Sequence, residues 1–155
     1  MTDRVAKATM LIRCSVAEAF DAFINPKKIT QFWLSATSGP LAEGARLSWS
    51  FMVPGATEAV TVTEFREQNR IGFEWSDGIK VAIDFKEHGS EAVRVSVEAT
   101  GFSREGVAEI VNATEGFSIV LCDLKTLLET GQSANLVRDK AALITASLGK
   151  PKADA

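Results

Sequence analysis

The chain has 155 residues, of which 46% are hydrophobic, and this composition suits one globular domain with a single core. Charged residues make up 24% and the formal net charge is -3, which argues against a disordered chain and against a nucleic-acid-binding protein. No run of hydrophobic residues exceeds four, far short of the ~20 that cross a bilayer, and no apolar signal-peptide core is present. We therefore expect a cytoplasmic protein with no membrane span.

The N-terminal part predicts one strand, over residues 5–12, followed by two short helices. Ser15 and Glu18 have the capping-box spacing, in which the serine hydroxyl and the glutamate carboxylate each accept a hydrogen bond from the other residue's backbone N–H. The apolar face of the helix that starts there holds Val16, Ala19, Phe20 and Phe23. Asn25 and Pro26 end this helix and begin the second one. The second helix carries Ile29, Phe32 and Trp33 on one face.

A hydrophobic period of two from residue 46 to residue 102 predicts an antiparallel meander. Turn residues separate its strands at Pro54-Gly55, Gln68-Asn69, Asp77-Gly78 and Gly89-Ser90. The alternating apolar positions are Leu47, Trp49, Phe51, Val53, Ile71, Phe73, Trp75, Ile79, Val81, Ile83, Phe85, Val93, Val95 and Val97. The predicted sheet therefore has one strongly apolar face and one solvated face.

A long helix is predicted after Ser103, which we interpret as its N-cap, and it ends at about Thr130 with Gly131 as the C′ residue. Its length of about 27 residues corresponds to about 40 Å, enough to cross a whole sheet. Its apolar stripe consists of Val107, Ile110, Val111, Thr114, Phe117, Leu121, Leu124 and Leu128, widened by Val120 and Leu127. A weak amphipathic helix follows, with Leu136, Val137, Leu143 and Ile144 as its apolar residues. We expect residues 134–147 either to fold back on the domain as a lid or to contact another subunit in a homodimer, and residues 149–155 to be frayed.

The order of these elements predicts an α+β fold, in which a curved antiparallel sheet of about six strands surrounds the long helix. We expect one domain over residues 1–131 and an extension over residues 132–155. Several segments also resemble a known family. The matching residues are segment 15–23, Asn25-Pro26, Phe32-Trp33, segment 70–75 and Gly116-Phe117, followed by Leu121, Leu124 and Leu128. They resemble the START-related helix-grip superfamily (SRPBCC), and within it the branch similar to activators of the heat-shock protein 90 ATPase, over about residues 4–130.

This resemblance implies a helix-grip fold, and such a fold tends to leave an apolar cavity between the sheet and the helix. The candidate lining residues are Trp33, Trp49, Phe51, Phe73, Trp75, Phe117 and Leu121, with Trp33 near the mouth that the resemblance implies. The alternative is that these side chains only pack the core, as large apolar residues do in any domain. Gly116, inside the long helix, costs about 1 kcal/mol relative to alanine, and we interpret it as a close approach of the helix to a neighbouring element.

Glu64 is the acidic residue of greatest interest, because it shares a strand face with Val60 and Val62. An inward orientation would bury its carboxyl, raise its pKa and make it a candidate acid or hydrogen-bond anchor in the cavity. The alternative is that the strand has already left the core at Glu64.

Reactive residue types are sparse in the rest of the chain. His88 is the only histidine and lies beside a turn, and the chain has no tyrosine. Cys14 and Cys122 are far apart in the sequence, and we interpret both as buried reduced thiols. The sequence therefore predicts neither a metal site nor a cofactor.

Three hypotheses for the function follow. The first is a non-catalytic binding domain for a small apolar molecule held in the cavity. The second, implied by the resemblance alone, is a co-chaperone that binds a heat-shock protein 90 homologue, with a role in the stress response. The third is a cyclase or hydrolase that uses the same cavity. A polar group such as Glu64, Thr114 or Ser118 that points into the cavity would distinguish this hypothesis, and without one the shape of the cavity alone would direct the reaction.

Overall fold

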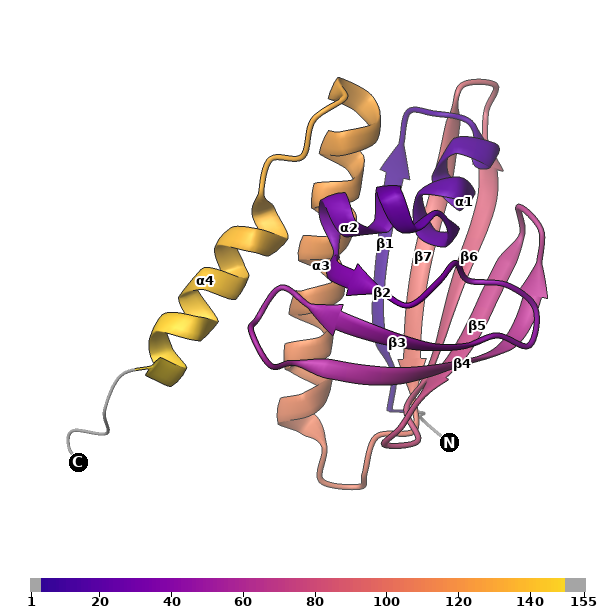
Figure 1. Ribbon diagram of the computed structural model, residues 1–155. Helices are drawn as coiled ribbons and strands as arrows, with labels where there is room; N and C mark the ends of the chain where they lie inside the picture. The colour runs from indigo at the N-terminus through magenta and orange to yellow at the C-terminus, as the bar shows by residue number, and fades with distance from the viewer. Residues whose placement is uncertain (1–3, 150–155) are drawn as a thin grey trace.

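The computed structural model describes residues 4–149, in which a strongly curved antiparallel sheet holds a long helix (Figure 1). The sheet has seven strands in the order β1-β7-β6-β5-β4-β3-β2. The strands are β1 (Ala6–Ile12), β2 (Leu34–Thr37), β3 (Arg46–Phe51), β4 (Thr57–Arg66), β5 (Arg70–Trp75), β6 (Lys80–His88) and β7 (Ala92–Thr100). The helices are α1 (Val16–Ile24), α2 (Pro26–Phe32), α3 (Val107–Thr130) and α4 (Leu136–Gly149). The predicted α+β class and the helix-grip arrangement are confirmed.

Two polar caps position α1 and α2 as predicted. Ser15 Oγ accepts a hydrogen bond from the Glu18 backbone N–H at 3.1 Å, and Glu18 Oε1 accepts one from the Ser15 N–H at 3.3 Å. Asn25 ends α1 and caps α2, because its Oδ1 accepts a hydrogen bond from the Lys27 N–H at 2.9 Å. The two helices pack across one end of the sheet (Figure 1). They bury Ala19, Phe20, Ala22, Phe23, Ile29 and Phe32.

The meander from β3 to β7 is confirmed, and β1 pairs with β7 at one edge of the sheet. At the other edge lies β2, which pairs with β3 and which the sequence pattern does not predict. With four residues, of which Leu34 is buried and the next two are exposed, β2 is too short to show a period of two. It brings the strand number to seven, against about six expected.

A β-bulge in β4 overturns the expected orientation of Glu64. Val62 pairs with Phe73, but Glu64 pairs with Gly72, so Thr63 is an extra residue on β4. One extra residue exchanges the two faces of the strand beyond it. Glu64 consequently lies on the outer face of the sheet, and its neighbour Phe65 packs against the core instead. The prediction that Glu64 shares the face of Val60 and Val62 is wrong.

The long helix α3 has 24 residues and begins later than predicted. The Ser103 carbonyl accepts a hydrogen bond from the Gly106 N–H in a turn, and Gly106 is the N-cap, so the assignment of Ser103 as N-cap is wrong. Gly131 ends the helix as predicted, with a left-handed φ of 88°. The buried apolar residues of the stripe are Phe117, Val120, Leu121, Leu124 and Leu127. Val107 and Val111, which the stripe included, are 67% and 60% exposed, because Ile110 and Ala113 are the residues of these first turns that pack against the core.

A buried carboxylate joins α4 to α3. Asp123 on α3 is 1% exposed, and its Oδ1 accepts a hydrogen bond from Ser133 Oγ at 2.6 Å. Its Oδ2 accepts one from the Val137 N–H at 3.1 Å, in the first turn of α4. A carboxylate in this position accepts a hydrogen bond from an N–H group that has no partner within the helix. Its negative charge is also stabilised by the positive N-terminal end of the helix dipole. Asp123 therefore fixes where α4 begins, a role that the sequence pattern does not reveal.

From that attachment α4 runs alongside α3 and diverges from it toward its C-terminal end (Figure 1). Exposure rises along one face of α4: Ala141 is 6% exposed, Ile144 is 39% exposed and Leu148 is 73% exposed. The predicted amphipathic helix thus folds back on the domain over its first half. The expected fraying concerns residues 150–155, which lie outside the described residues, while Gly149 ends α4. None of the described helices has the length and hydrophobicity needed to span a bilayer.

Candidate functional site

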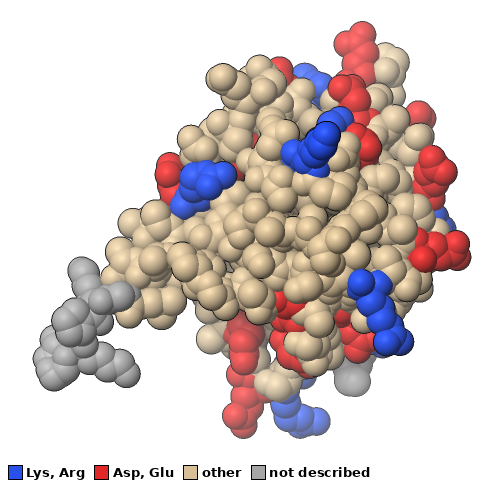
Figure 2. Space-filling model, viewed as in Figure 1, with Lys and Arg blue, Asp and Glu red and all other residues tan. Residues whose placement is uncertain are grey.

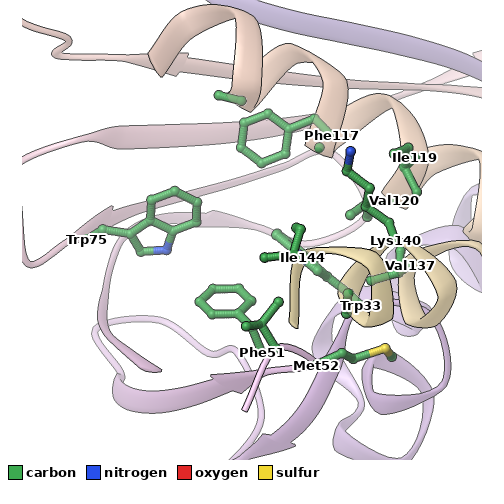
Figure 3. A pocket seen from close by; sticks show the side chains of 14 residues that line it. Trp33, Phe51, Met52, Trp75, Phe117, Ile119, Val120, Val137, Lys140 and Ile144 are labelled. Carbon is green, nitrogen blue, oxygen red and sulfur yellow. The ribbon is translucent and has the colours of Figure 1, made fainter. Parts of the chain in front are cut away.

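A pocket of about 250 Å³ opens between the ends of β3 and β5, α3 and α4 (Figure 3). The close-up draws 14 lining residues. The sheet side and the segment after α2 contribute Trp33, Phe51, Met52, Val53 and Trp75. Helix α3 contributes Ala113, Gly116, Phe117, Ile119 and Val120, and α4 contributes Val137, Lys140, Ala141 and Ile144. Lys140 is the one charged residue among these described lining residues.

Part of the open space in the pocket comes from Gly116. A Cβ atom added to Gly116 would meet no other atom within 4 Å. The interpretation of this glycine as a close approach between α3 and a neighbouring element is therefore wrong. Instead, the missing side chain leaves the pocket open on the α3 side, and a larger residue here would fill part of that space.

Four aromatic side chains form a wall of the pocket. Trp75 stacks on Phe117, with ring centroids 6.3 Å apart and an interplanar angle of 25°. Phe51 meets Trp75 edge to face at 6.3 Å and 86°, and Trp33 meets Phe117 at 6.4 Å and 80°. Offset and edge-to-face pairs of this kind hold the rings in fixed orientations. The wall is thus formed before any ligand arrives.

These four residues were candidates from the sequence, and three other candidates lie behind them. Trp49 is 1% exposed and its ring centroid lies 5.1 Å from that of Trp33 and 5.2 Å from that of Phe73. Phe73 and Leu121 are equally buried, at 1% and 0% exposed. None of the three is among the lining residues. They support the wall from the core, as the core-packing alternative expects.

The remaining candidate, Glu64, lies away from the pocket in an ion-pair cluster on the outer face of the sheet. Its carboxylate is 2.6 Å from Arg66 Nη2 and accepts a hydrogen bond from Arg70 Nε at 2.9 Å. Arg70 Nη1 also donates to Asp84 at 2.7 Å. These hydrogen bonds, to Asp84 first and then to Glu64, raise the pKa of Arg70. The cluster connects β4, β5 and β6, and the expectation that Glu64 lines the cavity is wrong.

The two α3 hydroxyl groups considered for catalysis are used within the helix. Thr114 Oγ1 donates to the Ile110 carbonyl at 2.7 Å, and Ser118 Oγ donates to the Thr114 carbonyl at 2.8 Å. Neither residue lines the pocket. Among the described lining residues there is no carboxylate, hydroxyl, thiol or imidazole side chain.

The other reactive side chains lie outside the pocket as well. Cys14 and Cys122 are partly buried and are both free thiols. Burial, followed by two nearby carboxylates, raises the pKa of Cys14 to about 11, so it stays protonated at neutral pH. His88 is exposed at the end of β6. Within residues 4–149, no group of three or more His, Cys, Asp or Glu side chains could hold a metal ion.

Two nitrogen atoms of lining residues differ in their hydrogen bonding: one has no partner within residues 4–149 and the other has a carboxylate partner. Trp75 Nε1 is buried and has no hydrogen-bond partner among the described residues. Lys140 extends from α4 toward α3, and its Nζ lies 3.3 Å from Glu115 Oε2 (Figure 3). Leaving a buried donor unpaired costs about 1–3 kcal/mol. Because Trp75 Nε1 is buried, a ligand in the pocket can reach the Lys140 ammonium group but not this N–H.

The surface around the pocket is mostly uncharged. Figure 2 shows a broad uncharged area over α4 and the adjoining part of the sheet, with most charged side chains toward the edges of this face. The large apolar side chains exposed on α3 and α4 are Val107, Val111, Leu143, Ile144 and Leu148.

Comparisons with known proteins agree with the fold. A family model described as activator of Hsp90 ATPase homolog 1-like protein matches residues 13–129. The crystal structure of protein SSP2350 from Staphylococcus saprophyticus is 24% identical, with a TM-score of 0.74 over 83% of this chain and 94% of that chain. The Aha1 dimer from Colwellia psychrerythraea is 16% identical, with a TM-score of 0.74 over 86% of this chain and 100% of that chain.

A third solved structure is that of DynU16, a protein in the dynemicin biosynthetic locus. It is 23% identical, with a TM-score of 0.76, and the match covers 85% of this chain and 49% of that chain. At these identities the solved structures show the fold. No curated protein sequence matches the chain. The family match ends at residue 129, so α4, which forms one side of the pocket, lies outside it.

Proposed function

Since this chain belongs to the family of activator of Hsp90 ATPase homolog 1-like proteins, we propose that it binds a small apolar molecule in the pocket and carries out no reaction on it. The observation that carries the proposal is the lining itself. Apart from Lys140, every described lining residue is apolar or glycine, and four of them are aromatic. Small-molecule sites in proteins are concave and mostly apolar, with few polar groups that orient the ligand.

The composition of the lining also favours binding over catalysis. General acid–base and nucleophilic catalysis use carboxylate, imidazole, hydroxyl, thiol or amine groups that touch the substrate. In the pocket, Lys140 is the one described side chain of these kinds, and it is paired with Glu115. The cyclase or hydrolase alternative would therefore depend on Lys140 and on the shape of the pocket.

Mass spectrometry of freshly purified protein, under native and then denaturing conditions, tests the proposal. We expect the native spectrum to show an apolar compound bound to the protein. The compound should be released on unfolding, and its mass should identify it. Gly116→Leu, which fills part of the pocket, is expected to purify without the compound. The matched control Asn112→Leu, which places the same side chain on an exposed part of α3, is expected to retain it. A bare wild-type protein whose melting temperature no apolar compound raises would contradict the proposal.

A second candidate function is binding to a heat-shock protein 90 homologue. It is supported by the family's description and by the exposed apolar side chains, of which Leu143 and Leu148 on α4 are 69% and 73% exposed. The test is capture of a purified homologue together with titration of its ATPase activity. Loss of capture in Leu143→Ser and Leu148→Ser would favour this candidate, and no capture by the wild-type protein would remove it. The role in the stress response and the cytoplasmic location remain predictions.

Native mass spectrometry also measures the oligomeric state of the protein. The solved Aha1 protein from Colwellia psychrerythraea is described as a dimer. A native mass spectrum of this chain reports directly whether it also forms a homodimer.

A further inference from the structure

The hydrogen-bonding side chains of the pocket are almost all donors. Lys140 supplies an ammonium group and Trp33 carries an indole N–H, whereas the indole N–H of Trp75 is buried. None of the described lining side chains carries an oxygen atom, and the Met52 sulfur is only a weak acceptor. A ligand that fits this lining must therefore bring acceptors, because donors on the ligand would find no strong side-chain acceptor.

Lys140 adds a positive charge to this set of donors. Its Nζ lies 3.3 Å from Glu115 Oε2, and the two side chains are 36% and 55% exposed. An ion pair between side chains this exposed contributes little to folding. An anionic oxygen on a ligand can replace Glu115 as the partner of Lys140, since the apolar part of the same ligand is held in the pocket.

The volume of the pocket limits the apolar part of the ligand. A cavity of about 150 Å³ lined by apolar side chains holds benzene, which has six non-hydrogen atoms. By the same ratio, about 250 Å³ holds about ten non-hydrogen atoms. This size matches a medium-length alkyl chain or a two-ring aromatic body.

We infer that the ligand is a small amphipathic anion, whose apolar body lies among the aromatic side chains and whose anionic oxygen head is bound by Lys140. The inference rests on the proposed function and names the ligand class for the same pocket. A neutral apolar molecule would leave Lys140 without a role in binding. A cationic head would be repelled by Lys140 and could pair only with Glu115 at the rim.

Titration with three probes that share a ten-carbon chain tests the head group directly. The probes are decanoate, 1-decanol and decylamine, and their binding is followed by tryptophan fluorescence, because Trp33 and Trp75 line the pocket. We expect decanoate to bind the wild-type protein about fivefold to tenfold more tightly than 1-decanol, as a half-exposed charge-assisted hydrogen bond allows. Decylamine is expected to bind most weakly. Adding decyl phosphate distinguishes a carboxylate head from a phosphate head within the same anionic class.

Three variants separate the charge of Lys140 from its packing. Lys140→Gln is expected to lower the affinity for decanoate to that for 1-decanol and to leave 1-decanol binding unchanged. Arg138→Gln removes the same charge from an exposed position on the same helix and is expected to change neither affinity. Glu115→Gln removes the competing carboxylate and is expected to raise the affinity for decanoate about twofold to fivefold.

The outcomes distinguish this inference from the proposed function. Equal affinities of the wild-type protein for decanoate and 1-decanol would overturn the anionic head while 1-decanol binding still supports the pocket. Unchanged decanoate binding by Lys140→Gln, or tighter binding of decylamine than of decanoate, would overturn it in the same way. If the wild-type protein binds none of the probes, the proposed function and the inference are both wrong.

Discussion

Replacing Gly116 with leucine is expected to stabilise the ligand-free protein and to block the pocket at the same time. Gly116 lies inside the 24-residue helix α3, where glycine costs about 1 kcal/mol relative to a good helix former. Because an added Cβ would meet no atom within 4 Å, no steric clash reduces this gain. The leucine side chain would then lie against the apolar lining of the pocket.

The expected size of the effect follows from two contributions. Full burial of a leucine side chain contributes about 1.5–3 kcal/mol, and since the pocket is open to solvent we take about 1 kcal/mol. Together with the helix term, the free energy of unfolding should rise by about 2 kcal/mol. For a chain of this size, that corresponds to a rise in melting temperature of about 4–8 °C.

Urea and thermal denaturation of the ligand-free variant measure the stability, and fluorescence titration with 1-decanol measures the pocket. Asn112→Leu is the control, and its free energy of unfolding is expected to change by less than about 0.5 kcal/mol with 1-decanol binding retained. A lower melting temperature for Gly116→Leu would show that α3 does contact a neighbouring element at this position. Unchanged 1-decanol binding by Gly116→Leu would show that Gly116 does not border the binding site.

Three further predictions concern other groups. Asp123→Ala removes the acceptor of two hydrogen bonds, so it should lower the free energy of unfolding by about 1–3 kcal/mol and speed hydrogen exchange in α4 more than in α1. The Lys125 ammonium, followed by the Arg13 backbone N–H, lowers the pKa of Glu129 below its ordinary 4.5. The ionised Glu129 carboxylate therefore contributes fully to stability above pH 4.5, and this contribution is lost as the pH falls through the lowered pKa of the folded protein. Glu129→Gln should accordingly flatten the loss of stability on acidification, as urea denaturation across this pH range would measure. Because the pKa of Cys14 is raised from 9.0 to about 11, its alkylation by iodoacetamide at pH 8 should be about a hundredfold slower than that of an ordinary thiol, and a rate like that of glutathione would contradict the raised value.

Local signals explain why so much of the fold could be predicted. The capping box of Ser15 and Glu18, the double role of Asn25 and the alternation along β3 to β7 depend on residues close in the sequence. For the aromatic residues Trp33, Phe51, Trp75 and Phe117, local alternation was not enough, and the family resemblance supplied the arrangement of sheet and helix that predicts a cavity beside them. Trp49 and Phe73 have the same alternation, and only the three-dimensional packing shows that they lie one layer behind.

The errors occur where the outcome depends on a distant part of the chain. Counting alternate residues placed Glu64 inward, but the extra residue Thr63 reversed the faces of β4. Gly72 on the neighbouring strand is the signal that could have shown this, since a Cβ there would come within 3.2 Å of the Glu64 Cβ. The α4 side of the pocket was missed for a related reason. The spacing of Val137, Ala141 and Ile144 indicates an apolar face but does not say what it packs against.

The attachment of α4 has a consequence for how this protein could acquire new ligand preferences. The 14-residue helix supplies one side of the pocket and its charged group, yet it lies beyond the family match that ends at residue 129. It is joined to the rest of the domain through the buried carboxylate of Asp123 at its first turn. Exchanging this helix while keeping Asp123, Ser133 and the buried contacts of Val137 and Ala141 would therefore alter the rim of the pocket. In the proposed function, the aromatic wall therefore comes from the family-matched stretch and the charged group from the stretch after it, which makes α4 the segment to exchange when the ligand preference of such a domain is redesigned.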